Sequence, residues 1–132
     1  MNNRKTKVLL IFSGLILLSV GAGILFWPHE FYKSNGTILG NEPGLLSEIR
    51  AGGGLLFGAG IFVFFSVFRS KLHHQALRLS ALVYITFGIA RLASIVFDGV
   101  PSTSLVVSTG IELLVGTLCI LALRQFHINT TT

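Results

Sequence analysis

The sequence predicts an all-α integral membrane protein, a four-transmembrane-helix bundle with both chain ends in the cytoplasm. Its composition supplies two of the three observations behind this prediction. Of the 132 residues, 52% are hydrophobic and only 11% are charged, whereas about a quarter of a typical soluble domain is charged. The mean hydropathy is +0.78. A soluble core could not bury so much apolar surface in a chain of this length, so lipid is the expected solvent.

Four long apolar stretches are the third observation. Each has about 20 residues, which at about 1.5 Å of rise per residue matches a hydrocarbon core of about 30 Å. The stretches are Val8–Trp27, Ala51–Phe68, Leu79–Phe97 and Leu105–Leu123. Because backbone polar groups in lipid need partners within the protein, each stretch should be a helix. The predicted spans are residues 8–27, 48–68, 77–97 and 104–123, within a single domain of residues 1–132.

The first predicted span follows a basic segment, residues 4–7, and ends at Trp27 and Pro28. A charged start and the small triplet Gly21–Gly23 also fit a cleaved signal peptide. We favour a retained helix, because the apolar run continues past the triplet to Trp27. An aromatic residue at that point suits the membrane interface.

The other three spans have recognisable starts or ends. The second opens with SEIRAGGG, in which two charged residues precede three glycines. The third follows the short basic loop RSKLHHQALR and ends at Asp98 and Gly99. The fourth begins after Pro101, where the hydroxyl groups of residues 102–104 can cap a helix.

The basic residues predict the orientation of the chain. The flanks of the first span, the middle loop and the end of the fourth span carry Arg4, Lys5, Lys7, Arg69, Lys71, Arg78 and Arg124. Only Lys33 lies in a loop on the opposite side. The positive-inside rule therefore places both termini and the middle loop in the cytoplasm, with the bacterial cytoplasmic (inner) membrane as the expected location. The same distribution explains the net charge of +5 without a nucleic-acid partner.

Five ionisable residues fall inside the predicted spans or at their mouths: Glu48, Arg50, Arg91, Asp98 and Glu112. Counted from the outer ends of their spans, Arg50, Arg91 and Glu112 lie about 9, 10 and 12 Å deep. Three helices thus carry charges at matching depth in the outer half of the membrane.

Helical spacing places each of these three charges on a face with small residues. The small residues are Gly54 and Gly58 beside Arg50, Gly88 beside Arg91, and Gly116 beside Glu112. Because small residues mark the places where membrane helices approach closely, we expect all three charges to point into the bundle.

An isolated charge in the middle of a membrane costs about 3 kcal/mol on insertion scales, and mutual pairing offsets that cost. We therefore predict a network of Arg50 and Arg91 with Glu112, with the carboxylates of Glu48 and Asp98 at its rim. Two interpretations stay open. The network can simply hold the helices in register. Alternatively, its members, together with Tyr84 and Ser94, line a polar cavity for an anionic or amphipathic ligand.

Three segments resemble a known family. They are SEIRAGGGLLFGAG, GIARLASIVFDGVPS and IELLVG, within residues 40 to 123. Together they resemble the small four-helix bacterial membrane proteins grouped as domain of unknown function 4345. Carried over position by position, the shared residues are Glu48, Arg50, Ala51, Gly54, Arg91, Ser94, Asp98, Gly99, Pro101, Ser102, Glu112 and Gly116. The resemblance implies a four-helix membrane bundle and supplies no activity.

Three classes of function are compatible with these residues. We favour a non-enzymatic bundle in the lipid bilayer that binds a lipid, a small amphipathic molecule or a membrane protein partner through the outer-half pocket. The alternative is a small proton-coupled transporter using Glu112 and the arginines, which would need a homodimer formed through the glycine seam.

An intramembrane enzyme is the least expected class, because no nucleophile lies beside a base at helical spacing. No cofactor motif and no metal site are predicted. The adjacent His73 and His74 point to different sides of a helix. The single cysteine, Cys119, fits a small buried hydrophobic residue.

Overall fold

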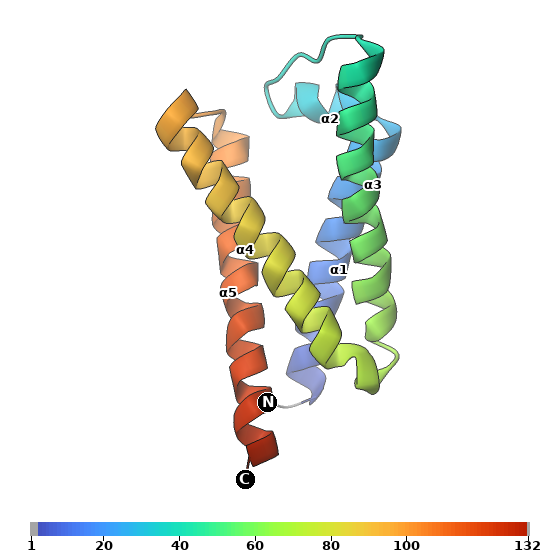
Figure 1. Ribbon diagram of the computed structural model, residues 1–132, viewed down its shortest axis with the longest axis vertical. Coiled ribbons are helices and arrows are strands. Elements are labelled where there is room, and N and C mark those ends of the chain that lie inside the picture. Colours follow the sequence, from blue (N-terminus) through green and yellow to red (C-terminus); the bar gives the residue numbers. More distant parts are fainter. Residues whose placement is uncertain (1–2, 132) are drawn as a thin grey trace.

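The computed structural model describes residues 3–131, which form helices joined by short connections (Figure 1). The elements are α1 (Asn3–Phe26), α2 (Pro28–Ser34), α3 (Pro43–Ser66), the 3-10 turn η1 (Ser70–Leu72), α4 (His73–Asp98) and α5 (Thr103–Thr131). By length and composition α1, α3, α4 and α5 are each able to cross a membrane. The prediction of an all-helical chain with four long apolar helices is confirmed.

The four long helices form two hairpins. α1 packs chiefly against α3 in the first hairpin, and α4 packs against α5 in the second. The start of α1, the end of α5 and the turn η1 lie at one end of the molecule, which we call the terminal end (Figure 1). α2 and the α4–α5 turn lie at the other, the α2 end. The hairpins are close at the terminal end and diverge toward the α2 end, because α4 runs obliquely across α1.

Glycines on both helices bring α1 and α3 together. A Cβ at Gly60 would lie 2.7 Å from the Leu18 nitrogen, and one at Gly53 would lie 2.8 Å from the Leu25 nitrogen. On α1, Gly21 faces the backbone of Phe57 equally closely. Contacts this short between backbones are possible only without side chains, so these glycines allow the helices to pack.

The prediction that Gly54 and Gly58 pack against other helices of the bundle is wrong. A Cβ at Gly54 or Gly58 would meet nothing within 4 Å, so neither glycine marks a close approach of another helix among the described residues. The buried stripe of α3 is instead Gly53, Leu56, Gly60, Val63 and Ser66. Three consecutive glycines offer three faces, and the buried face is the one that also carries Leu56 and Val63, although the exposed faces carry apolar residues such as Leu55 and Phe65.

A buried set of hydroxyl groups joins the two hairpins near their crossing. The Tyr84 hydroxyl donates to the Ser13 carbonyl oxygen at 2.7 Å, and the Ser13 hydroxyl donates to that of Ser80 at 2.8 Å. Tyr84 is 2% exposed, and both serines are fully buried. Because buried polar groups need partners, these bonds fix the position of α4 against α1.

The helices extend beyond the predicted spans. α3 begins at Pro43 rather than residue 48, α4 begins at His73 rather than residue 77, and α5 continues to Thr131 rather than residue 123. A helix needs no apolar surface where it leaves the bundle, and proline is well suited to the first helical turn. The short helix α2 was also not expected, since the residues after Pro28 carry turn signals.

Candidate functional site

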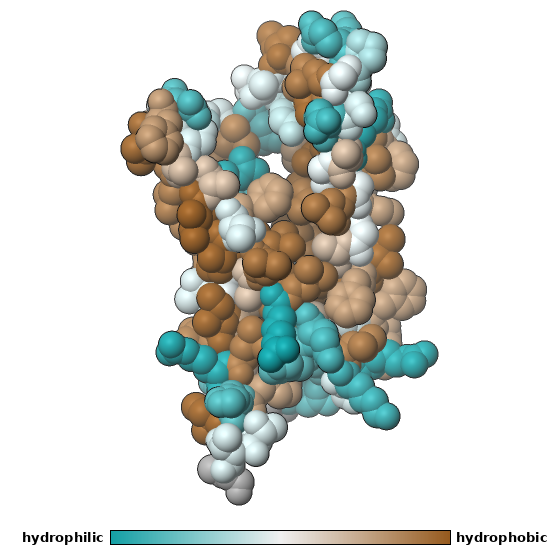
Figure 2. Space-filling model, in the orientation of Figure 1, coloured by the Kyte–Doolittle hydropathy of each residue, from teal (hydrophilic) through white to brown (hydrophobic). Residues whose placement is uncertain are grey.

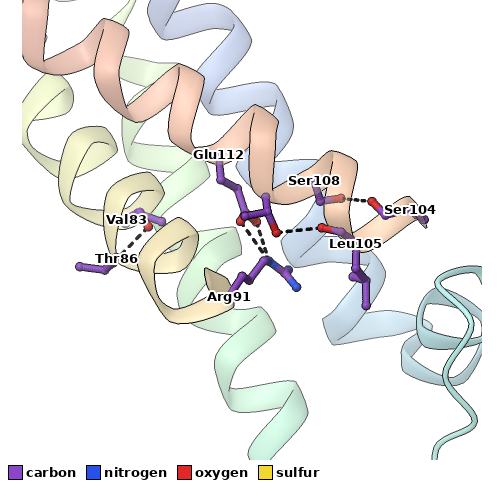
Figure 3. Close-up of polar contacts among 8 residues, drawn as sticks. Val83, Thr86, Arg91, Ser104, Leu105, Ser108 and Glu112 are labelled. Atoms are coloured by element: carbon purple, nitrogen blue, oxygen red, sulfur yellow. Dashed lines mark hydrogen bonds and ion pairs between the residues drawn. The ribbon is translucent and has the colours of Figure 1, made fainter. Parts of the chain in front are cut away.

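Arg91 of α4 and Glu112 of α5 form an ion pair between the two helices of the second hairpin. The Arg91 Nε donates to both carboxylate oxygens of Glu112, at 3.1 and 3.0 Å (Figure 3). Their side chains are 32% and 15% exposed. The pair is therefore partly buried but still accessible from the space between the hairpins.

Close helix packing beside the pair brings the two side chains within reach. Gly88 lies three residues before Arg91, and a Cβ there would lie 2.5 Å from the Leu113 side chain. Gly116 lies four residues after Glu112, where a Cβ would lie 2.7 Å from the Ile85 side chain. Each glycine thus lies within about one helical turn of a charged residue, on the same face of its helix.

A cavity separates the hairpins next to the ion pair, and Figure 2 shows the hollow between their upper parts. Its volume is about 150 Å³, and Arg91 and Glu112 form part of its wall. Most of the remaining wall is apolar and includes Ile16, Val20, Ile24, Leu56, Phe87 and Leu105. A second hollow of about 350 Å³ opens between α1 and α5 and is also lined by the pair. The only charged groups in both walls are therefore those of the pair.

Asn35, which follows α2, closes the cavity at the α2 end. Its carbonyl oxygen accepts a hydrogen bond from Ser102 at 2.7 Å, and its side-chain oxygen accepts one from Ser104 at 2.8 Å. The next residue, Gly36, has φ +82° and lies against the Ser102 side chain. The segment after α2 thus fastens the first hairpin to the start of α5, and these two serine hydroxyls bond Asn35 instead of capping α5.

Arg50 does not join the pair, and the prediction that it would is wrong. Its side chain is exposed and donates a hydrogen bond to the carbonyl oxygen of Leu25. Leu25 is in the last turn of α1, where carbonyl groups lack partners within the helix and the helix dipole favours a cation. Arg50 lies at the edge of the buried stripe of α3, so its side chain reaches the end of α1 rather than α4 or α5.

The remaining predicted network members are also separate from the pair. Asp98 accepts a hydrogen bond from Ser94 at 2.9 Å, and both residues are exposed at the end of α4. Glu48 is exposed, and its carboxylate makes no polar contact with another residue among 3–131. The five charges therefore do not form one network. Tyr84 lines the cavity with Arg91 and Glu112, but its hydroxyl is already bonded to Ser13.

Comparison with known proteins identifies a family. A family model described as "Domain of unknown function (DUF4345)" matches residues 5–123, which confirms the resemblance seen in the sequence. No curated protein and no solved structure shows significant similarity to the chain.

Proposed function

The chain belongs to the DUF4345 family, and we propose that it is a multi-pass protein of the bacterial cytoplasmic membrane with both termini inside. The four long apolar helices support the four crossings. The basic residues in the first turns of α1, in and beside the connection between α3 and α4, and after the apolar part of α5 support the orientation. In this orientation the α2 end, with the cavity and the ion pair, lies in the outer half of the membrane.

The orientation is tested by cysteine labelling after Cys119→Ser, which removes the native thiol. Single cysteines replace Asn41 in the α2–α3 loop or Lys71 in η1. A membrane-impermeant maleimide added to intact cells should label the first and not the second. Labelling of the Lys71 position alone would reverse the proposed orientation.

We further propose that the protein is a non-enzymatic bundle that holds a lipid or small amphipathic molecule between its hairpins. The observation that carries this proposal is the Arg91–Glu112 pair in the wall of a mostly apolar cavity. Charged groups inside a membrane are costly and mark sites of function by default. An apolar cleft with a few convergent polar groups is also the usual form of a small-molecule site.

The test is to fill the cavity and follow the bound lipid. Val20 lines both hollows, so Val20→Trp places a large side chain in the space that a ligand would occupy. Leu15→Trp is the matched control, because Leu15 lies on the outward face of α1 and is 46% exposed. Native mass spectrometry in mild detergent should show lipid adducts on the wild type and the control, and their loss from Val20→Trp. Equal adducts on all three folded proteins would contradict the proposal.

A second candidate, a dimeric proton-coupled transporter, is favoured by one observation. Gly54 and Gly58 form a GxxxG motif on α3, where a Cβ would meet nothing within 4 Å among the described residues, and so leave room for a helix of a second copy. Crosslinking in native membranes tests this candidate. A dimer that is lost in Gly54→Leu would support it, whereas monomer alone would count against it.

A further inference from the structure

The Arg91–Glu112 pair leaves most of its hydrogen-bonding capacity unused. Only the Nε of Arg91 contacts the carboxylate, although an arginine and a carboxylate often form two parallel N–H···O bonds. Both terminal nitrogens of Arg91 lack a hydrogen-bond partner within residues 3–131, and they extend past the carboxylate in Figure 3. Each Glu112 oxygen keeps a lone pair. Donors and acceptors thus lie side by side in the wall of the cavity.

The charge of the pair restricts what can bind to it. The pair is formally neutral, so an added anion or cation would leave one uncompensated charge in a region of low dielectric constant, which is unfavourable. A head group with both signs avoids this cost. Its anionic part can bind the terminal nitrogens of Arg91 while its cationic part binds Glu112, and the total charge stays at zero.

A trough between α1 and α5 provides space for an acyl chain. These two helices contact each other only lightly. The 350 Å³ hollow beside the ion pair and a third, largely apolar hollow of about 500 Å³ toward the terminal end both include Ile16 in their walls. The hollow toward the terminal end follows α1 from Ile16 to Arg4, which is about 18 Å along the helix, and Arg4 and Lys5 form its far end. The two hollows thus lie one after the other along α1, on either side of Ile16, and we call them together the α1–α5 trough.

We propose, building on the proposed function, that the ligand is a phospholipid with a phosphoethanolamine-type head group. The phosphate binds the terminal nitrogens of Arg91, the ammonium donates to Glu112, and one acyl chain lies in the α1–α5 trough. A quaternary ammonium has no N–H to donate to Glu112, so a phosphocholine head group fits less well. An anionic phosphoglycerol head group lacks the cation altogether.

The wild-type protein tests this head-group preference without any substitution. The full chain in mild detergent is given equimolar phosphatidylethanolamine, phosphatidylcholine and phosphatidylglycerol with identical acyl chains, and adducts are counted by native mass spectrometry. The phosphatidylethanolamine adduct should exceed each of the others by about tenfold, the scale of one charge-assisted hydrogen bond. Phosphatidylglycerol or phosphatidylcholine adducts equal to or above it would overturn the proposal.

The variant Glu112→Gln tests which group reads the ammonium. This variant keeps the shape of the side chain and removes its charge, so the preference for phosphatidylethanolamine over phosphatidylglycerol should fall by about tenfold. Glu48→Gln is the matched control, because Glu48 is an exposed carboxylate with no polar contact among the described residues. An unchanged preference in folded Glu112→Gln would show that Glu112 does not bind the head group. If that variant does not fold, the wild-type competition alone decides.

The cavity-filling variant separates this inference from the proposed function. Loss of adducts in Val20→Trp, together with a wild-type preference for phosphatidylglycerol, would overturn only the head-group assignment. Adducts of every class that persist in folded Val20→Trp would place the lipid elsewhere, and both proposals would fall.

Discussion

Helix α1 meets α3 and α5 in different ways. Against α3 it packs backbone to backbone at Gly21, Gly53 and Gly60. Against α5 it makes only light contact, and the trough that includes Phe12 and Ile16 stays open. Both faces of α1 are apolar, so hydrophobicity does not distinguish them. In the proposed membrane location an apolar side chain gains little by exchanging lipid for another helix, so closure there depends on small residues that face each other.

The comparison is tested most strongly by placing a large side chain in the closed contact. In Gly21→Leu the new side chain would overlap the backbone of Phe57, which belongs to α3 and cannot move aside cheaply. We expect a loss of about 3 kcal/mol or more in the free energy of unfolding, or failure to fold. Unfolding in mixed micelles with increasing sodium dodecyl sulfate, followed by far-ultraviolet circular dichroism, measures this loss.

Gly58→Leu is the control for this substitution, since a Cβ there meets nothing within 4 Å. Its effect on the stability of the monomer should stay within about 0.5 kcal/mol. Equal losses in the two variants would mean that the α1–α3 contact is not the tighter one.

The Arg91–Glu112 pair in the wall of the cavity should contribute less to stability than the α1–α3 contact at Gly21. Arg91→Gln and Glu112→Gln each leave one partly buried charge without its partner, and we expect each to cost about 1–2 kcal/mol, reduced by the partial exposure of the pair. The double variant should cost less than the sum of the two. A thermal-stability double-mutant cycle measures this coupling, and strictly additive losses would argue against a direct pair.

The hydroxyl contact between the hairpins should rank next. Tyr84→Phe removes the hydrogen bond to the Ser13 carbonyl and leaves that buried acceptor without this donor, which should cost about 1 kcal/mol. Thr86→Val is the control, because the exposed Thr86 hydroxyl bonds only carbonyls of its own helix. Thermal unfolding monitored by circular dichroism should separate the two variants. A loss in Thr86→Val as large as that in Tyr84→Phe would assign the effect to α4 itself rather than to its contact with α1.

The smallest loss of stability is expected for Arg50, which bonds the last turn of α1 at the end of the α1–α3 contact. Arg50→Gln removes a cation from the last turn of α1, and because Arg50 is exposed the loss should be about 0.5 kcal/mol. Chemical unfolding of Arg50→Gln, with Glu48→Gln as the control variant, is sensitive enough to detect this loss. A loss as large as that of Arg91→Gln would mean that Arg50 belongs to a larger charged network after all.

The number and order of the long helices were predictable because an apolar stretch of sufficient length is a strong local signal. The packing faces were less predictable. In the Gly52–Gly54 run every face is small, and the choice of Gly53 depends on Leu56 and Val63 facing α1, which is a property of the packed pair. Helical spacing alone favoured Gly54 and Gly58, whose faces are open.

At the site, Arg91 in α4 and Glu112 in α5 lie at similar predicted depths, and this similarity correctly predicted that they pair. The same argument failed for Arg50, because depth says nothing about the direction in which a side chain turns. Asn35 was missed for a different reason. Its serine partners lie 67 and 69 residues further along the chain, and an asparagine before a glycine looks like an ordinary turn.

The order of the helices has a consequence for how the protein is made. Each hairpin pairs helices that are neighbours in sequence, and the chain passes from the first hairpin to the second through the short segment around η1. The first hairpin can therefore close while the ribosome is still producing the second. The bonds from Ser102 and Ser104 to Asn35 must then form late, once α5 has begun. The cavity between the hairpins is accordingly completed last during synthesis, and in the proposed membrane location lipid can enter it before it closes.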